Sequence, residues 1–178
     1  MRAFFVMACF LLSTTAGLAQ SIGIQFDKMP VGTKLYYKDY EGDTWVQEYR
    51  GKSGKFHIMS EKHADRNLSV TRRYNAQGHL VSIRYVGGGE ITYKPFKCER
   101  VLGTCTYRYN GNPKYSGVYK TTLTQASDGY HYSLNSVSND EGYDSVIKVG
   151  PYNVLQEETW TGSNGKKRFE RLVKIETP

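Results

Sequence analysis

Short stretches of alternating apolar and polar residues, separated by glycine-containing turns, recur along almost the whole chain. Between residues 79 and 94 this alternation runs on both sides of the triplet Gly87-Gly88-Gly89. A period of two places the apolar side chains on one face of a β-strand. Two such strands joined by a short glycine turn pair as an antiparallel hairpin. Residues 79–94 therefore predict a hairpin with one buried and one solvent-facing side.

The same order of an aromatic residue, a polar turn with glycine and a further strand appears at several other places. It is found at 49–56, 74–80, 109–115 and 160–165, and further strands are predicted at 34–40, 117–125, 129–137, 143–149 and 166–175. The 15 tyrosines and 18 glycines favour β structure, since aromatic residues fill strands and glycine interrupts them. Helical periodicity is nearly absent, and residues 60–67 are expected to form a loop.

Roughly ten to twelve short strands joined by tight turns predict an antiparallel up-and-down meander, because short turns make sequence neighbours pair. A sheet with so many strands curls, closes or splits. We therefore expect an all-β domain whose sheet forms a closed or strongly curved barrel, with a two-sheet β-sandwich as the alternative. Charged residues on the predicted strands, such as Arg84 and Glu170, argue against a barrel that spans a membrane.

The N-terminal residues 1–19 have the order of a secretory signal peptide. A positive start at Arg2 is followed by an apolar run over 3–12 and by small residues that end at Ala19. Cleavage is expected between Ala19 and Gln20, which leaves residues 20–178 as a single domain. No second long apolar run follows, so no transmembrane span is predicted in the mature chain. The protein is expected to be exported, to the periplasm or to the extracellular space.

Two cysteines remain after this cleavage, Cys98 and Cys105. Both would reach an oxidising compartment, where disulfides form and persist. Gly103 between them is suited to a turn, so a disulfide across a short hairpin is predicted. Closing so small a loop stabilises a fold by only about 2–3 kcal/mol, and its main effect is to fix local geometry. The spacing is not that of a redox-active Cys-x-x-Cys pair.

No motif of catalysis, metal binding or cofactor binding emerges from the sequence. The four histidines lack the spacing of metal ligands, and no serine or cysteine lies in a nucleophile elbow. Glu157 and Glu158 are adjacent on a predicted strand, so their side chains point to opposite faces and cannot act as a pair. No catalytic residue, metal site or cofactor is therefore predicted. An enzyme whose site is assembled from distant residues is the less favoured reading.

The formal net charge of +7 is spread along the chain. On an exported protein such a surface suits anionic lipid headgroups, an acidic polysaccharide or an acidic protein of the cell envelope, or it serves solubility alone. Positive charge and aromatic residues are compatible with nucleic acid, but export disfavours that partner.

Aromatic residues form a candidate binding surface, since several lie two positions apart and so share a strand face. They are Trp45, Tyr49, Tyr107, Tyr109, Tyr130, Tyr132 and Trp160. Inward-facing rings would fill the core or line a ligand cavity, whereas outward-facing rings would stack on a polymer. The sequence thus favours a non-enzymatic barrel protein that binds a lipid, another apolar molecule or an anionic envelope glycan. The alternative is a structural or protein-interaction module of the envelope.

Overall fold

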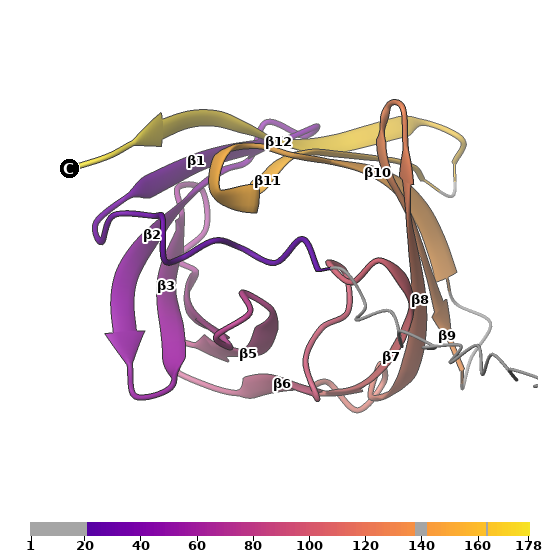
Figure 1. Ribbon diagram of the computed structural model, residues 1–178, viewed down its shortest axis with the longest axis horizontal. Coiled ribbons are helices and arrows are strands. Elements are labelled where there is room, and N and C mark those ends of the chain that lie inside the picture. The colour runs from indigo at the N-terminus through magenta and orange to yellow at the C-terminus, as the bar shows by residue number, and fades with distance from the viewer. Residues whose placement is uncertain (1–20, 138–141, 163) are drawn as a thin grey trace, which may run out of the picture.

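The structure, a computed structural model, describes residues 21–137, 142–162 and 164–178. In these ranges twelve antiparallel strands form one closed barrel (Figure 1). Each strand pairs with its neighbours in sequence, and the last pairs with the first. This confirms the predicted up-and-down barrel and rules out the two-sheet sandwich. The elements are β1 (Lys34–Asp39), β2 (Thr44–Ser53), β3 (Phe56–His63), β4 (Ser69–Tyr74), β5 (Leu80–Tyr85), β6 (Glu90–Lys94), β7 (Gly103–Asn110), β8 (Gly117–Ala126), β9 (Gly129–Ser136), β10 (Gly142–Val149), the 3-10 helix η1 (Pro151–Asn153), β11 (Leu155–Thr161) and β12 (Lys167–Glu176).

The predicted signal peptide of residues 1–19, with its cleavage point between Ala19 and Gln20, lies outside the described residues and stays a prediction. Across the described ranges, no helix is both long and apolar enough to cross a bilayer. The loop predicted for 60–67 is wrong in its first half, because β3 continues to His63. The polar residues that concealed this strand include Glu61, which is buried inside the barrel.

A β-bulge lies where the barrel closes, between β1 and β12. Tyr36 pairs with Lys174, but the next residue, Tyr37, pairs with Leu172. The extra residue, Val173, is 54% exposed. A bulge of this kind increases the local twist and bends the strand, which helps a sheet to close. The strict alternation predicted for this strand therefore breaks at Val173.

The N-terminal segment 21–33 lies across one end of the barrel, as the indigo trace in Figure 1 shows. Backbone hydrogen bonds fix it there. The Ile24 amide donates to the Gly78 carbonyl at 3.2 Å, and the Gln25 amide donates to the Tyr152 carbonyl at 2.9 Å. These bonds join the segment to the β4–β5 turn and to η1, so that it closes this end of the barrel.

Phe26 lies at the centre of the apolar core at the closed end of the barrel. Its ring stacks on His57 at 4.6 Å and packs against Tyr49 at 4.9 Å and Tyr74 at 5.1 Å, measured between ring centroids. The Tyr49 hydroxyl and His57 Nδ1 share a hydrogen bond of 2.8 Å. The N-terminal segment thus contributes core side chains, and the barrel is solid at this end.

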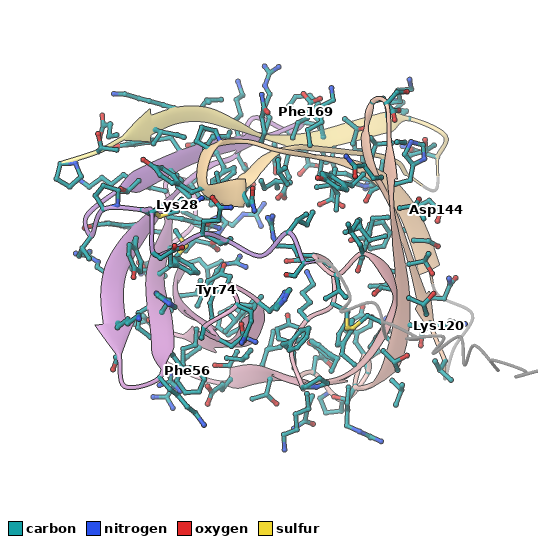
Figure 2. The ribbon with its side chains drawn as sticks, in the orientation of Figure 1. Lys28, Phe56, Tyr74, Lys120, Asp144 and Phe169 are labelled. Carbon is teal, nitrogen blue, oxygen red and sulfur yellow. A yellow bond between two sulfur atoms is a disulfide. The ribbon has the colours of Figure 1, made fainter. Side chains whose placement is uncertain are left out.

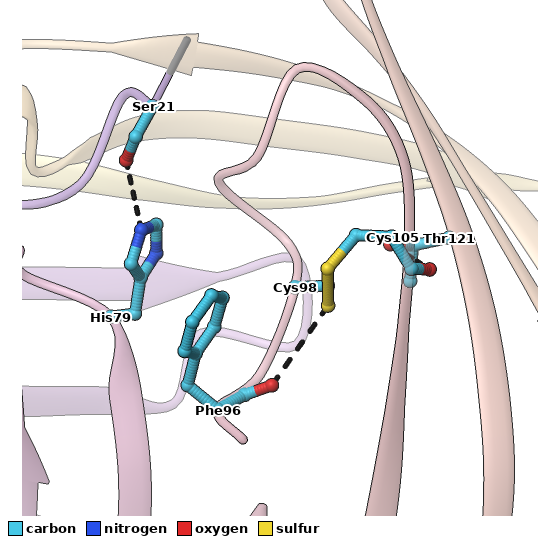
Figure 3. The surroundings of a disulfide bond; sticks show 6 residues. All are labelled: Ser21, His79, Phe96, Cys98, Cys105 and Thr121. Carbon is cyan, nitrogen blue, oxygen red and sulfur yellow. Dashed lines mark hydrogen bonds between the residues drawn. A yellow bond between two sulfur atoms is a disulfide. The ribbon is translucent and has the colours of Figure 1, made fainter. Parts of the chain in front are cut away.

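The disulfide predicted between Cys98 and Cys105 is confirmed, with Cα atoms 5.8 Å apart (Figure 3). Its setting differs from the predicted hairpin. Cys98 is fully buried in the loop 95–102, whereas Cys105 is part of β7. The bond therefore ties an inward-folded loop to the barrel wall. Residue Lys97 of the same loop donates its backbone N–H to the Leu80 carbonyl at 2.8 Å.

Candidate functional site: the interior cavity

A cavity of about 990 Å³ lies inside the barrel, a size that suits a small organic molecule. Strands β1 to β5 and β10 to β12 form its walls, and the loop 95–102 supplies its floor. The cavity reaches the end of the barrel opposite the N-terminal segment, where Leu68 and Thr161 line it. Figure 2 shows side chains directed into the interior, Tyr74 among them.

The floor of the cavity is charged. Lys97 and Glu99 form an ion pair, and Arg100 donates from Nη1 to the Asn153 carbonyl at 2.6 Å. Burial alone would raise the pKa of Glu99, but the positive charges of Lys97 and Arg100 hold it below its usual value. The three charges on this loop are thus engaged with protein partners.

One wall of the cavity carries a compensated ion pair between Glu61 of β3 and Arg72 of β4. Arg72 donates two hydrogen bonds to the carboxylate, from Nε at 2.7 Å and from Nη2 at 3.1 Å. Gln47 adds a bond of 2.7 Å, and His63 Nε2 lies 3.1 Å from the same carboxylate. Burial opposes ionisation, yet Arg72 keeps the pKa of Glu61 below its ordinary value. This wall is therefore electrostatically satisfied.

The opposite wall carries two carboxylates without such a partner. Glu158 of β11 and Glu170 of β12 are direct cross-strand neighbours, and both line the cavity. In the described part of the chain no lysine, arginine or histidine forms an ion pair with either. Burial raises both pKa values, and the nearby charge of Glu158 helps to raise the pKa of Glu170 to about 7.

Two buried hydroxyls lie on β9 and β10, the strands that follow β11 in the sheet. Tyr132 of β9 and Ser145 of β10 are cross-strand neighbours, exposed by only 2% and 5%. Neither hydroxyl makes a hydrogen bond with any residue that the structure describes. The Ser145 hydroxyl faces Glu158 and partly offsets the rise of its pKa, although the geometry falls short of a hydrogen bond. Buried polar atoms are nearly always paired in folded proteins, so the Ser145 hydroxyl beside Glu158 is suited to a bound molecule.

Comparison with protein-family models, with curated proteins and with solved structures finds no match to this chain. Any inference about function therefore rests on the residues of the cavity, because a barrel fold alone does not define a function.

The aromatic residues singled out in the sequence all face the interior, but only two of them line the cavity. These are Trp45 and Trp160. Tyr49, Tyr107 and Tyr132 are buried in the core, Tyr109 packs against Tyr93 and Tyr119, and Tyr130 packs against the cluster around Leu123. The outer aromatic face on which a bound glycan would stack is not formed by these residues.

The histidines do not converge on a common site. His57 and His79 are buried at the closed end, His63 contacts Glu61 in the cavity wall, and the exposed His131 pairs with Asp128. A cluster of Asp39, Glu41 and Asp43 in the β1–β2 turn has carboxylate oxygens close enough for a metal ion. However, Asp39 Oδ1 accepts the backbone amides of Glu41 and Asp43, as in an ordinary turn.

Sequence reasoning missed the acidic pair because it compared Glu158 with the wrong residue. Glu157 does point to the other face, where it accepts a hydrogen bond from Lys148 at 3.2 Å. The residue that matches Glu158 is Glu170, twelve positions away on the next strand. The sequence does contain a clue to the pair, since each strand of the predicted hairpin has one charged residue at an inward-facing position. The clue can be used only when the register of the two strands is known.

Proposed function

We propose that this protein is an exported, non-enzymatic binding protein that holds a small organic molecule inside its barrel. The observation that carries the proposal is the cavity of about 990 Å³ that is closed at one end and lined by both aromatic and charged side chains. Export is supported by the signal-like N-terminus and by the Cys98–Cys105 disulfide.

The charged residues that line the cavity make some classes of ligand less suitable than others. A purely apolar molecule, as the sequence suggested, would remove water from Glu158 and Glu170 without replacing the lost hydrogen bonds, which is costly. A ligand with polar groups and a flat or ring-shaped body would instead satisfy the carboxylates and pack against Trp45 and Trp160. We therefore favour a polar or amphipathic small molecule over a lipid tail.

Native mass spectrometry of protein purified from the periplasm of a bacterial host tests this proposal. We expect a bound mass of small-molecule size that disappears in the denatured spectrum. The variant Leu68→Trp places a large ring at the open end of the cavity and should reduce the bound fraction. The matched control Val86→Trp adds the same ring at a position that is 76% exposed, and it should leave the bound fraction unchanged.

Two results would count against ligand binding in the cavity. One is bare protein in the native spectrum both before and after incubation with small-molecule panels. The other is a bound mass that survives equally in wild type and in Leu68→Trp, which would place the molecule elsewhere on the protein. Circular dichroism of both tryptophan variants checks that the barrel is intact.

A further inference from the structure

The charges inside the barrel are unevenly compensated. The cations that line the cavity are engaged, Arg72 by Glu61, Lys97 by Glu99, Arg100 by the Asn153 carbonyl and Arg168 by the Tyr40 ring at 5.0 Å. Glu158 and Glu170 have no corresponding partner among the described residues. The unsatisfied charge of the cavity is therefore negative, and it is concentrated on the wall formed by β11 and β12.

A further hydrogen-bond acceptor lies at this wall. The hydroxyl of Ser145 is buried and has no hydrogen-bond partner among the described residues, and its lone pairs can accept an N–H donor. Ser145 belongs to β10, the strand next to β11, and its hydroxyl faces Glu158. The two carboxylates and the Ser145 hydroxyl thus offer acceptors on one part of the wall.

Aromatic rings border the same part of the wall. Tyr37 faces Glu170 and Tyr143 faces Glu158, closely enough for the carboxylates to influence their ionisation. Trp160 is the cross-strand neighbour of Ser145. The faces of tyrosine and tryptophan rings attract organic cations, and more strongly where water is excluded. Carboxylates beside aromatic rings are the chemistry that recognises ammonium and guanidinium groups.

We infer that the cavity recognises a small organic cation, with its ammonium or guanidinium group seated between Glu158 and Glu170 and donating to the Ser145 hydroxyl. This inference rests on the proposed function and names the class of ligand. A bare metal ion is a poorer occupant, because the cavity is far larger than an ion and the hydroxyl beside the two carboxylates is a neutral donor on a partly aromatic wall.

Cation binding at this wall should depend on pH. Glu170 is faced by Glu158 from β11, by Asp39 from β1, by Arg72 from β4 and by Lys97 and Glu99 from the floor. Its pKa of about 7 means that the carboxyl is largely protonated at pH 5 and ionised at pH 8. A cation prefers the ionised form, so its affinity should rise by about tenfold or more between these two pH values.

Isothermal titration calorimetry with matched probe molecules tests the inference. The probes of one series share the same ring and differ only in the charge of the attached group, as in 2-phenylethylamine, 2-phenylethanol and phenylacetate. Parallel series with cyclohexyl and naphthyl rings vary the ring. Phosphate buffer is used because Tris is itself an amine. We expect the amines to bind at least tenfold more tightly than the alcohols at pH 8, and the carboxylates not to bind.

Glu170→Gln removes the charge while keeping the shape. It should strongly reduce the preference for amines and the pH dependence of their affinity, although Glu158 remains. Glu157→Gln, which changes the neighbouring outward-facing carboxylate, should bind like wild type. Glu170→Gln is expected to fold, because it replaces a carboxyl whose ionisation is disfavoured inside the barrel.

Three outcomes would overturn the inference. They are equal or stronger binding of the alcohols or carboxylates, an amine preference that is undiminished in Glu170→Gln, and calcium binding that Glu170→Gln abolishes while no amine binds. A neutral or anionic molecule found bound in the native mass spectrum would overturn it too, yet would support ligand binding in the cavity. The failure of the inference is thus distinguishable from the failure of the proposed function.

Discussion

Glu158 and Glu170 lie directly opposite each other on β11 and β12, with both side chains facing the interior of the barrel. Like charges at directly opposed positions of a sheet destabilise the pairing. The raised pKa values of both carboxyls express this cost, together with the cost of burial. Because no cation among the described residues forms an ion pair with either carboxyl, this pair lowers the stability of the empty barrel.

The empty barrel should be more stable when Glu170 is made neutral. The folded pKa of about 7 lies above the ordinary value of 4.5, so ionisation of Glu170 costs stability as pH rises from about 4.5 to 7. Glu170→Gln should therefore raise the Tm by roughly 10 °C at pH 8 and leave it nearly unchanged at pH 4. Thermal unfolding at both pH values measures this, and an equal shift at the two would contradict the assigned pKa.

Arg72→Met should destabilise the protein strongly, because it leaves the carboxylate of Glu61, which is 4% exposed, without its partner. Removing one member of a buried ion pair costs about 3–5 kcal/mol. The neighbouring Arg73 makes only a long ion pair of 3.5 Å at the surface, so Arg73→Met should cost less than about 1 kcal/mol. Urea unfolding at pH 7 compares the two variants, and similar losses would contradict the role given to Glu61.

The turn at Gly78 should be intolerant of any side chain. Its φ of +77° is unfavourable for other residues, and an added Cβ would lie 2.2 Å from the Ile24 carbonyl oxygen. Gly78→Ala should therefore weaken the docking of the N-terminal segment as well as strain the turn. Gly87 has a similar φ of +85° with open space around it, so Gly87→Ala should cost only about 1 kcal/mol.

Hydrogen exchange distinguishes these two glycine variants. In Gly78→Ala the amides of residues 24–26 should exchange faster, whereas Gly87→Ala should leave their protection intact. Unchanged protection in Gly78→Ala would show that the N-terminal segment docks independently of this turn.

Loss of the disulfide should loosen the cavity floor more than the barrel. The bond joins the fully buried Cys98 to β7, and closing so short a loop contributes about 2–3 kcal/mol. In the double variant Cys98→Ala, Cys105→Ala we expect a loss of this size in urea unfolding. The far-UV spectrum should keep its β character, and a collapse of that spectrum would show that the bond is needed for the barrel itself.

The strand pattern could be predicted from the sequence because inward and outward residues alternate with period two. Residues 79–94 show this alternation on both sides of a glycine turn, and they form β5 and β6. The prediction failed where charge is buried inside. Glu61 made the end of β3 resemble a loop, since a buried carboxylate is recognisable only once its partner Arg72 is known.

The candidate site was beyond local sequence reasoning for the same reason. Trp45 and Trp160 were found because aromatic residues on strands are conspicuous, but Glu158 and Glu170 become a pair only through the register of β11 with β12. The charged floor could not be predicted either, because Lys97 and Glu99 line the cavity only through the inward path of the loop 95–102. No spacing rule within the sequence encodes such placements.

The most direct test of a ligand site inside the barrel is fluorine NMR of protein labelled with 5-fluorotryptophan. Both tryptophans of the chain, Trp45 and Trp160, line the cavity, so the two resonances report on its interior. Titration with the amine probes at pH 8 should shift both resonances, and the same probes at pH 5 should shift them less. Binding that calorimetry detects while neither resonance moves would place the ligand outside the barrel and contradict the account.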